Sequence, residues 1–422
     1  MKLNTWTPML DESLARAARE TLFEIARSLP EPGARDTNAS LGHGEAGFAL
    51  FHAYLAESGL LDPERAEPHR ELMLAHLQAA VSKLGDLGGR FDLLSGFMGL
   101  SWTANHLHGL NLLDDIDELC DVSDRAALDL LDEQGDQMLC ELVSGLSGVG
   151  LYGLARRHRP IGEELVQRVR RALEVTAVRT EGRRTWFHTP ERMSATSVHS
   201  HQEGCFNLGL SHGVPGALVF LSRTGTSDLL TEATDWLLQQ RRNYRNGSRF
   251  GYTFTVDPMH EPDGARLAWC YGDLGVSVAL LSIARHAGRL DWEAEAIDLA
   301  LNAARRPRDG SGVVDAGLCH GAIGNAHIFM KLYWATGEPA LLQATHRWLR
   351  DGLHMRVEGK GLAGFSAYWP LMPNEPERAL WQPSSSLVDG TCGIGLALIG
   401  MLVPMPPAWD EVFMLDIPAK VH

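Results

Sequence analysis

Two kinds of apolar segment alternate along this chain. One kind is a run rich in Ala, Leu and Val with few charges, as in LSHGVPGALVFLS and LVDGTCGIGLALIGML. The other is amphipathic, with apolar residues at i, i+3, i+4 and i+7, as in LLTEATDWLLQQRRN and DWEAEAIDLALNAARR. A run that is apolar on nearly all sides is typical of a helix buried all round, whereas an amphipathic run turns one face to solvent. The pattern therefore predicts alternating inner and outer helices.

Each inner run opens on the same motif, Gly-x-x-Gly, which occurs seven times. The first glycines of successive motifs are 49 to 69 residues apart, which leaves room for two ordinary helices and their connections. The pairs are Gly44/Gly47, Gly96/Gly99, Gly145/Gly148, Gly213/Gly216, Gly272/Gly275, Gly321/Gly324 and Gly390/Gly393. The glycines let the backbone turn sharply and let inner helices start close together. Each unit therefore reads as an outer helix, a glycine turn and an inner helix.

Seven such hairpins form either an open solenoid or a closed ring. The first and last units keep the same buried character, whereas an open array needs polar caps at its ends. We therefore expect an all-α fold, an α/α toroid of seven inner and seven outer helices, in one domain spanning residues 1–422. The connections at about 176–206 and 353–385 depart from the helical pattern and look like insertions on a common rim.

Composition narrows the class of protein. Of 422 residues, 45% are hydrophobic and 22% charged, which is an ordinary globular balance. A net charge of −15 argues against nucleic-acid binding. The start has no apolar signal region, and the run GIGLALIGMLVPMP is too short and too interrupted to cross a bilayer. Six cysteines are too few for a disulfide framework in a chain this long, so we expect a cytoplasmic protein whose cysteines are buried fillers, metal ligands or nucleophiles.

Two of those cysteines occupy equivalent positions in their repeats. Cys270 and Cys319 each stand two residues before the first glycine of their unit, and His212 and His320 each stand one residue before it. In a closed ring, equivalent positions of all repeats come together at one end of the ring, so we expect these four side chains to lie close together. Two thiolates and an imidazole without a fourth protein ligand match an open catalytic zinc site. Adjacent Cys319 and His320 would point about 100° apart on a regular helix, so the pair suits an irregular turn.

The same residue types also fit purely structural roles. A cysteine at a crowded helix start can be a small, partly buried side chain that only fills space in the packing. This interpretation fits the remaining four cysteines, Cys120, Cys140, Cys205 and Cys392. A competing metal site is VHSHQEGC, where His199, His201 and Cys205 have the spacing of loop ligands. That segment also reads as an exposed loop.

The seven glycine units, together with SHG, WCYG and CHG, resemble the lanthionine synthetase C (LanC) family over almost the whole chain. The resemblance implies an α/α toroid with one Zn²⁺. Carried over onto this sequence, the zinc ligands are Cys270, Cys319 and His320. His212 matches the acid/base histidine of the family, and Arg266 and Tyr271 match its arginine and tyrosine beside the zinc.

The third unit departs from the family pattern. The family usually has an aspartate there, in a motif like D-V-I-x-G, whereas this chain reads ELVSG with Glu141. Glutamate keeps the carboxylate and adds a methylene, so a partnership between Glu141 and His212 is expected. The alternative is an ordinary acid near a helix start.

The resemblance implies a stand-alone class I lantibiotic cyclase. Such an enzyme adds peptide cysteine thiols to dehydroalanine or dehydrobutyrine and closes (methyl)lanthionine rings in a lanthipeptide precursor. The implied partners are the leader and core of that dehydrated peptide and the dehydratase and transporter of a biosynthetic complex, with no nucleic acid and no insertion into a membrane. Residues 176–206 then form either a small insertion with short strands that grips the leader or a solvated loop.

Three alternatives remain at this stage. A relative in the same group would add glutathione to dehydrated residues. Another α/α-toroid zinc protein, such as a prenyltransferase subunit, would normally use an aspartate ligand, which WCYG and CHG lack. A non-catalytic scaffold would only hold the modified peptide.

Overall fold

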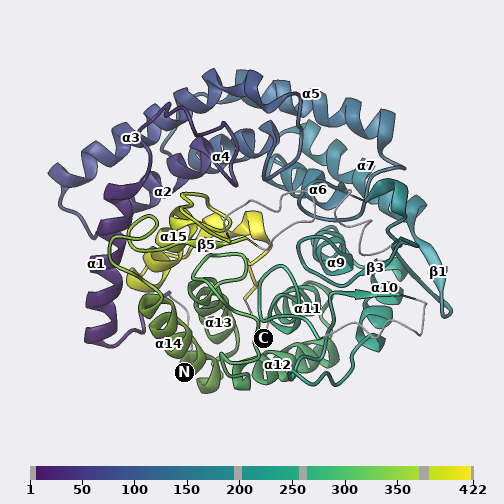
Figure 1. Ribbon diagram of the computed structural model, residues 1–422. Coiled ribbons are helices and arrows are strands. Elements are labelled where there is room, and N and C mark those ends of the chain that lie inside the picture. The colour runs from purple at the N-terminus through teal and green to yellow at the C-terminus, as the bar shows by residue number, and fades with distance from the viewer. Residues whose placement is uncertain (1–5, 194–201, 256–263, 370–379, 420–422) are drawn as a thin grey trace. The chain divides into compact units, whose positions relative to one another are not determined.

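Every inner helix begins directly after the first glycine of its motif. The computed structural model describes residues 6–193, 202–255, 264–369 and 380–419. The inner helices are α2 (Glu45–Glu57), α4 (Phe97–Gly109), α6 (Leu146–Ala155), α9 (Val214–Ser222), α11 (Asp273–Ala287), α13 (Ala322–Thr336) and α15 (Thr391–Leu402) (Figure 1). Most of their residues are buried on every side, as the apolar runs predicted. Among the described helices, none is both long and apolar enough to cross a membrane.

The outer helices alternate with the inner ones along the chain. They are α1 (Glu12–Ser28), α3 (Pro63–Ser82), α5 (Asp117–Gln134), α7 (Pro160–Thr176), α10 (Asp228–Gln239), α12 (Leu290–Arg305) and α14 (Pro339–His354). They are amphipathic; α1, for example, buries Leu14, Leu22 and Ile25 on one face. Side-chain caps start three of them, because Asp11, Asp62 and Ser227 each accept a backbone N–H of the first turn. The predicted seven inner and seven outer helices are therefore present.

The chain folds into two compact units. The first comprises Met1–Ser123 and Val313–Asp410. Within it α13 packs on α15, α15 on α2, and α2 on α4, while α1 packs against α14 and α15 (Figure 1). The first and last repeats of the sequence therefore lie side by side in this unit. It also holds a 3₁₀ turn, η1 (Leu84–Leu87), and a small antiparallel pair, β5 (Ala367–Tyr368) with β6 (Trp381–Gln382).

The second unit comprises Asp124–Gly312 and Glu411–His422. Within it α6 packs on α9 and α9 on α11. The hairpin of β1 (Val178–Thr180) and β2 (Arg183–Thr185) contacts α10, and β3 (Phe206–Asn207) pairs with β4 (Thr253–Phe254). The segment 176–206 thus contains short strands and a 3₁₀ turn, η2 (Pro190–Arg192). Its assignment as a leader-gripping insertion stays a prediction. The last short helix, η3 (Ala408–Phe413), runs from the end of the first unit into the second.

A close backbone approach requires the second glycine in six of the seven motifs. A Cβ on Gly324 would lie 1.9 Å from the carbonyl oxygen of Leu318, six residues earlier. The same clash arises in other repeats, for example 2.0 Å between a Cβ on Gly393 and the carbonyl oxygen of Leu387. Contacts this short do not occur between real atoms, so the turns before these six inner helices close only with glycine at this position.

We expect Gly324→Ala to lower the free energy of unfolding by more than about 2 kcal/mol, because the clashing atom is backbone and cannot move aside. Gly109→Ala is the matched control, since that glycine also lies in an inner helix but has open space around its Cβ position. The control should be neutral or slightly stabilising. Urea unfolding followed by circular dichroism measures both, and equal midpoints for the two variants would contradict the steric argument.

Candidate active site

Backbone hydrogen bonds join the turns that precede neighbouring inner helices. In the second unit, the Leu142 N–H donates to the Ser211 carbonyl (3.0 Å) and the Ser211 N–H donates to the Cys270 carbonyl (3.4 Å). In the first unit, the Cys319 N–H donates to the Val388 carbonyl (2.9 Å). Ser211, Cys270, Cys319 and Val388 occupy the same place in their repeats. Equivalent positions therefore do converge within each unit, as the repeat alignment predicted.

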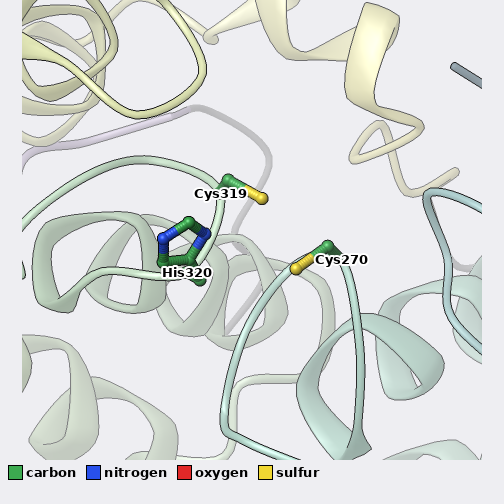
Figure 2. Close-up of side chains that lie close together, drawn as sticks. All are labelled: Cys270, Cys319 and His320. Atoms are coloured by element: carbon green, nitrogen blue, oxygen red, sulfur yellow. The ribbon is translucent and has the colours of Figure 1, made fainter. Parts of the chain in front are cut away.

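The two equivalent cysteines and His320 form a cluster of potential metal ligands. One ligand atom from each of Cys270, Cys319 and His320 lies within 4.8 Å of the others (Figure 2). Figure 2 shows the side chains on two loops that lead into helices, with the Cys270 sulfur pointing toward the loop of the other two. Cys319 and His320 lie in an irregular turn just before α13, as their adjacency predicted. Both cysteines are buried, and the His320 side chain is 16% exposed.

This donor set fits Zn²⁺. Zinc binds thiolate sulfur at about 2.3 Å and imidazole nitrogen at about 2.0 Å, so two sulfurs of a tetrahedral site lie about 3.8 Å apart. Ligand atoms gathered within 4.8 Å need only a small contraction to reach that geometry. Three protein ligands leave one position for another molecule, which is the arrangement of catalytic zinc sites.

Two carboxylates flank His320, and the sequence did not single out either of them. Asp315 Oδ2 lies 3.7 Å from His320 Nε2, and Asp389 Oδ1 lies 3.8 Å from His320 Nδ1. Asp315 is buried and its two oxygens accept the backbone N–H groups of Gly317 (3.2 Å) and Tyr368 (3.0 Å). Whichever ring nitrogen binds a metal, the other has a carboxylate nearby to orient the ring.

Glu141 and His212 form a hydrogen-bonded pair. His212 Nδ1 lies 2.9 Å from Glu141 Oε2, and the glutamate is buried while the imidazole is 45% exposed. Burial lowers the pKa of His212, but the hydrogen bond and negative charge of Glu141 raise it more, so the net pKa lies above its ordinary value. Burial likewise raises the pKa of Glu141, and the bonds to His212 and Ser144 more than offset this, so the carboxylate stays ionised.

Glu141 also caps its own turn. Its oxygens accept the backbone N–H groups of Val143 (2.9 Å) and Ser144 (2.6 Å). Asp92 holds the equivalent place in the second repeat and accepts the N–H of Ser95 (2.6 Å), so an acid at this position is a recurring cap. Glu141 therefore contacts His212 and also caps its own turn, and its part in catalysis stays a prediction.

Tyr271 lies beside this pair. Its ring centroid is 6.4 Å from that of His212, and its hydroxyl oxygen is 3.2 Å from Nδ2 of Asn207. Burial raises the pKa of Tyr271 above its ordinary value, so the phenol is protonated at neutral pH. Asn207 carries no family motif, and sequence reasoning missed it.

Arg266 is placed on the same loop as Tyr271. Its backbone N–H donates to the hydroxyl of Tyr252 (3.1 Å), and the Tyr252 ring packs on Tyr271 with 5.2 Å between centroids. Gly312, in the left-handed conformation, leaves room for the Arg266 side chain, since a Cβ there would lie 2.7 Å from Arg266 Cβ. The arginine side chain is half-buried.

Three of the other cysteines are buried thiols that burial keeps protonated. Burial raises the pKa of Cys140, of Cys392 and of Cys205, the last to about 12. Among the described residues, the only cluster of metal-ligating side chains is the one around Cys319. Of the competing loop site, His199 and His201 lie outside the described residues.

Comparison with known structures defines the class of fold. The structure matches that of nisin cyclase with a TM-score of 0.72 and 17% sequence identity, over 96% of this chain and 98% of that one. The predicted α/α-toroid class is thereby confirmed. The family model described as "Lanthionine synthetase C-like protein" matches residues 35–414, so the chain belongs to the lanthionine synthetase C-like family. A search of curated protein sequences gives no match.

Proposed function

We propose that this protein is a zinc-dependent lanthionine cyclase. It adds a cysteine thiol of a dehydrated precursor peptide to the β-carbon of a dehydroalanine or dehydrobutyrine in the same peptide, which closes a thioether ring. The observation that carries the proposal is the Cys270–Cys319–His320 cluster in a member of this family. The nearby pair of His212 and Glu141 supplies the proton-transfer group that the addition needs.

Cys270, Cys319 and His320 would hold one Zn²⁺. A free thiol has a pKa of about 8.5 and is mostly protonated at neutral pH, and zinc bound here would favour the thiolate of the substrate cysteine. Two protein thiolates offset much of the ion's charge and so leave that sulfur nucleophilic. Asp315 and Asp389 would orient the imidazole of His320.

His212 serves as the proton donor to the α-carbon. Because its Nδ1 is bonded to Glu141, its Nε2 is the nitrogen left to face the substrate. The raised pKa keeps part of the imidazole protonated near neutral pH, and the ionised glutamate stabilises that form. The histidine then takes a proton from the next incoming thiol and returns to its starting state after each ring closure.

Tyr271 and Arg266 stabilise the charge that develops on the substrate. Attack on the β-carbon moves negative charge to the carbonyl oxygen of the dehydrated residue as an enolate. A protonated phenol and a guanidinium on one loop are suitable donors for that oxygen. The peptide itself must be dehydrated before it binds, so a dehydratase acts first, and we place the protein in the cytoplasm with that enzyme and an exporter.

The decisive test uses the zinc-loaded protein and a dehydrated precursor peptide. After incubation, free thiols are alkylated with N-ethylmaleimide and counted by mass spectrometry. We expect fewer alkylations in the peptide and no change of the unalkylated mass, because ring closure is an isomerisation. A peptide that instead gains the mass of glutathione, when glutathione is present, would favour the thiol-adding relatives. Thiols that all remain free would contradict the cyclase.

A further inference from the structure

The orientation of the Asn207 amide is fixed by the turn in which it stands. The backbone N–H of Gly209 donates to Asn207 Oδ1 (3.0 Å), so this side-chain atom is an acceptor. The atom that faces Tyr271 is therefore Nδ2, which can only donate, and it lies 3.2 Å from the hydroxyl oxygen. Tyr271 is thus the acceptor in this bond.

A phenol that accepts a hydrogen bond keeps its own hydrogen for another partner. The Tyr271 ring is held in place, because a Cβ on Gly209 would stand 2.7 Å from two of its ring carbons and Tyr252 packs on it. Only the hydroxyl torsion is free, and the amide hydrogen of Asn207 keeps the phenol hydrogen away from that side. The hydrogen is therefore presented away from Asn207. The His212 ring lies 6.4 Å from the Tyr271 ring, measured between centroids.

We infer that Asn207 is a positioning residue that fixes Tyr271 as a hydrogen-bond donor to the substrate's developing enolate oxygen. The inference rests on the proposed function. The inference explains why Asn207, which belongs to no family motif, is buried against Tyr271. Toward the substrate, Tyr271 then acts as a hydrogen-bond donor and not as an acceptor or a base.

Other repeats show how to test this without disturbing the turn. Asn38 Oδ1 accepts the N–H of Ser40 (2.9 Å) and Asp315 Oδ1 accepts the N–H of Gly317 (3.2 Å), at the place that Asn207 holds in its own repeat. Aspartate is therefore compatible with this turn. Asn207→Asp keeps the turn but replaces the amide donor with an acceptor, which draws the Tyr271 hydrogen to itself.

The experiment compares Asn207→Asp, Tyr271→Phe and the double variant, with Asn38→Asp as the matched control. We expect kcat for ring closure to fall about 100-fold in both single variants, with KM and zinc content near the wild-type values. The double variant should be no slower than Tyr271→Phe. Asn38→Asp should keep the wild-type rate, because it makes the same change in the turn of the first repeat, whereas it is Asn207 that is bonded to Tyr271.

A second readout needs no substrate. The tyrosine Fermi doublet in ultraviolet resonance Raman spectra distinguishes a phenol that accepts a hydrogen bond from one that donates. Subtracting the Tyr271→Phe spectrum from the wild-type spectrum leaves the signal of Tyr271, which should be that of a phenol that accepts a hydrogen bond. Subtracting the spectrum of the double variant from that of Asn207→Asp should leave the signal of a phenol that donates one.

Three outcomes would overturn the inference: a wild-type rate in Asn207→Asp, a Raman signal showing that Tyr271 accepts no hydrogen bond in the wild type, or a double variant much slower than Tyr271→Phe. The last would mean that the new charge itself causes the loss. Each leaves the cyclase proposal standing if the wild type closes rings. A wild type that closes none refutes the cyclase, while the Raman comparison still tests the pairing of Asn207 and Tyr271.

Discussion

Cys319→Ala should lower the zinc content of the purified protein from about one ion per chain to almost none. Removal of one of three protein ligands leaves only a thiolate and an imidazole, and even the loss of an outer-shell partner typically costs 10- to 100-fold in metal affinity. We therefore expect zinc affinity to fall by more than about 100-fold and ring closure to fall with it. Cys270→Ala should behave in the same way, because the two sulfurs lie in one cluster.

Cys392→Ala is the matched control for both variants. This cysteine is also fully buried at the start of an inner helix, but its sulfur lies 3.2 Å from the Gly47 carbonyl and belongs to no described metal cluster. The Cys392→Ala variant should therefore keep its zinc. Elemental mass spectrometry on all four proteins, with circular dichroism to verify folding, measures the outcome. Zinc retained in both ligand variants would place the metal elsewhere, and a folded wild type without zinc would favour the scaffold alternative.

His212→Ala should lower kcat for ring closure by about 10²- to 10⁴-fold while zinc content stays at the wild-type level. General acid–base catalysis contributes a factor of this size, and His212 is not a member of the described metal cluster. The thiolate would still form, but the enolate would have to take its proton from water. Quantifying cyclised peptide over time, with zinc measured on the same samples, separates this effect from loss of the metal.

Variants of two capping acids refine that result. Glu141→Gln keeps an oxygen for the turn and removes the charge that stabilises protonated His212, so it should be slow as well. Asp92→Asn makes the same change in the cap of the second repeat and should keep full activity, because Glu141 is the acid that is bonded to His212. Ring closure at the wild-type rate in His212→Ala would exclude the histidine as the acid.

Local pattern was enough to predict the helices, because each inner helix must start where glycine permits a backbone approach that a Cβ would block. The repeat alignment also placed Cys270 and Cys319 together, because the two cysteines hold the same position in their repeats. It could not show which residues surround them. Asn207 contacts Tyr271 from 64 positions away, and no periodicity relates the two.

The carboxylates near His320 escaped prediction for a similar reason. Asp315 looks like a turn residue in the sequence, and it is one, since it accepts the Gly317 N–H. Its second oxygen faces His320 and the strand β5 only because the connection after α14 returns to this place. A side chain that serves a turn with one atom and a site with another has no distinct signature in a single sequence.

The packing of α15 on α1 and α2 has a consequence for biosynthesis. These helices stand at opposite ends of the chain, so the apolar faces of α1 and α2 that α15 covers stay uncovered until residue 402 has left the ribosome. At about 5–20 residues per second, that interval lasts tens of seconds. The nascent chain therefore carries exposed apolar surface for most of its synthesis, and a message truncated before α15 would yield an aggregation-prone product.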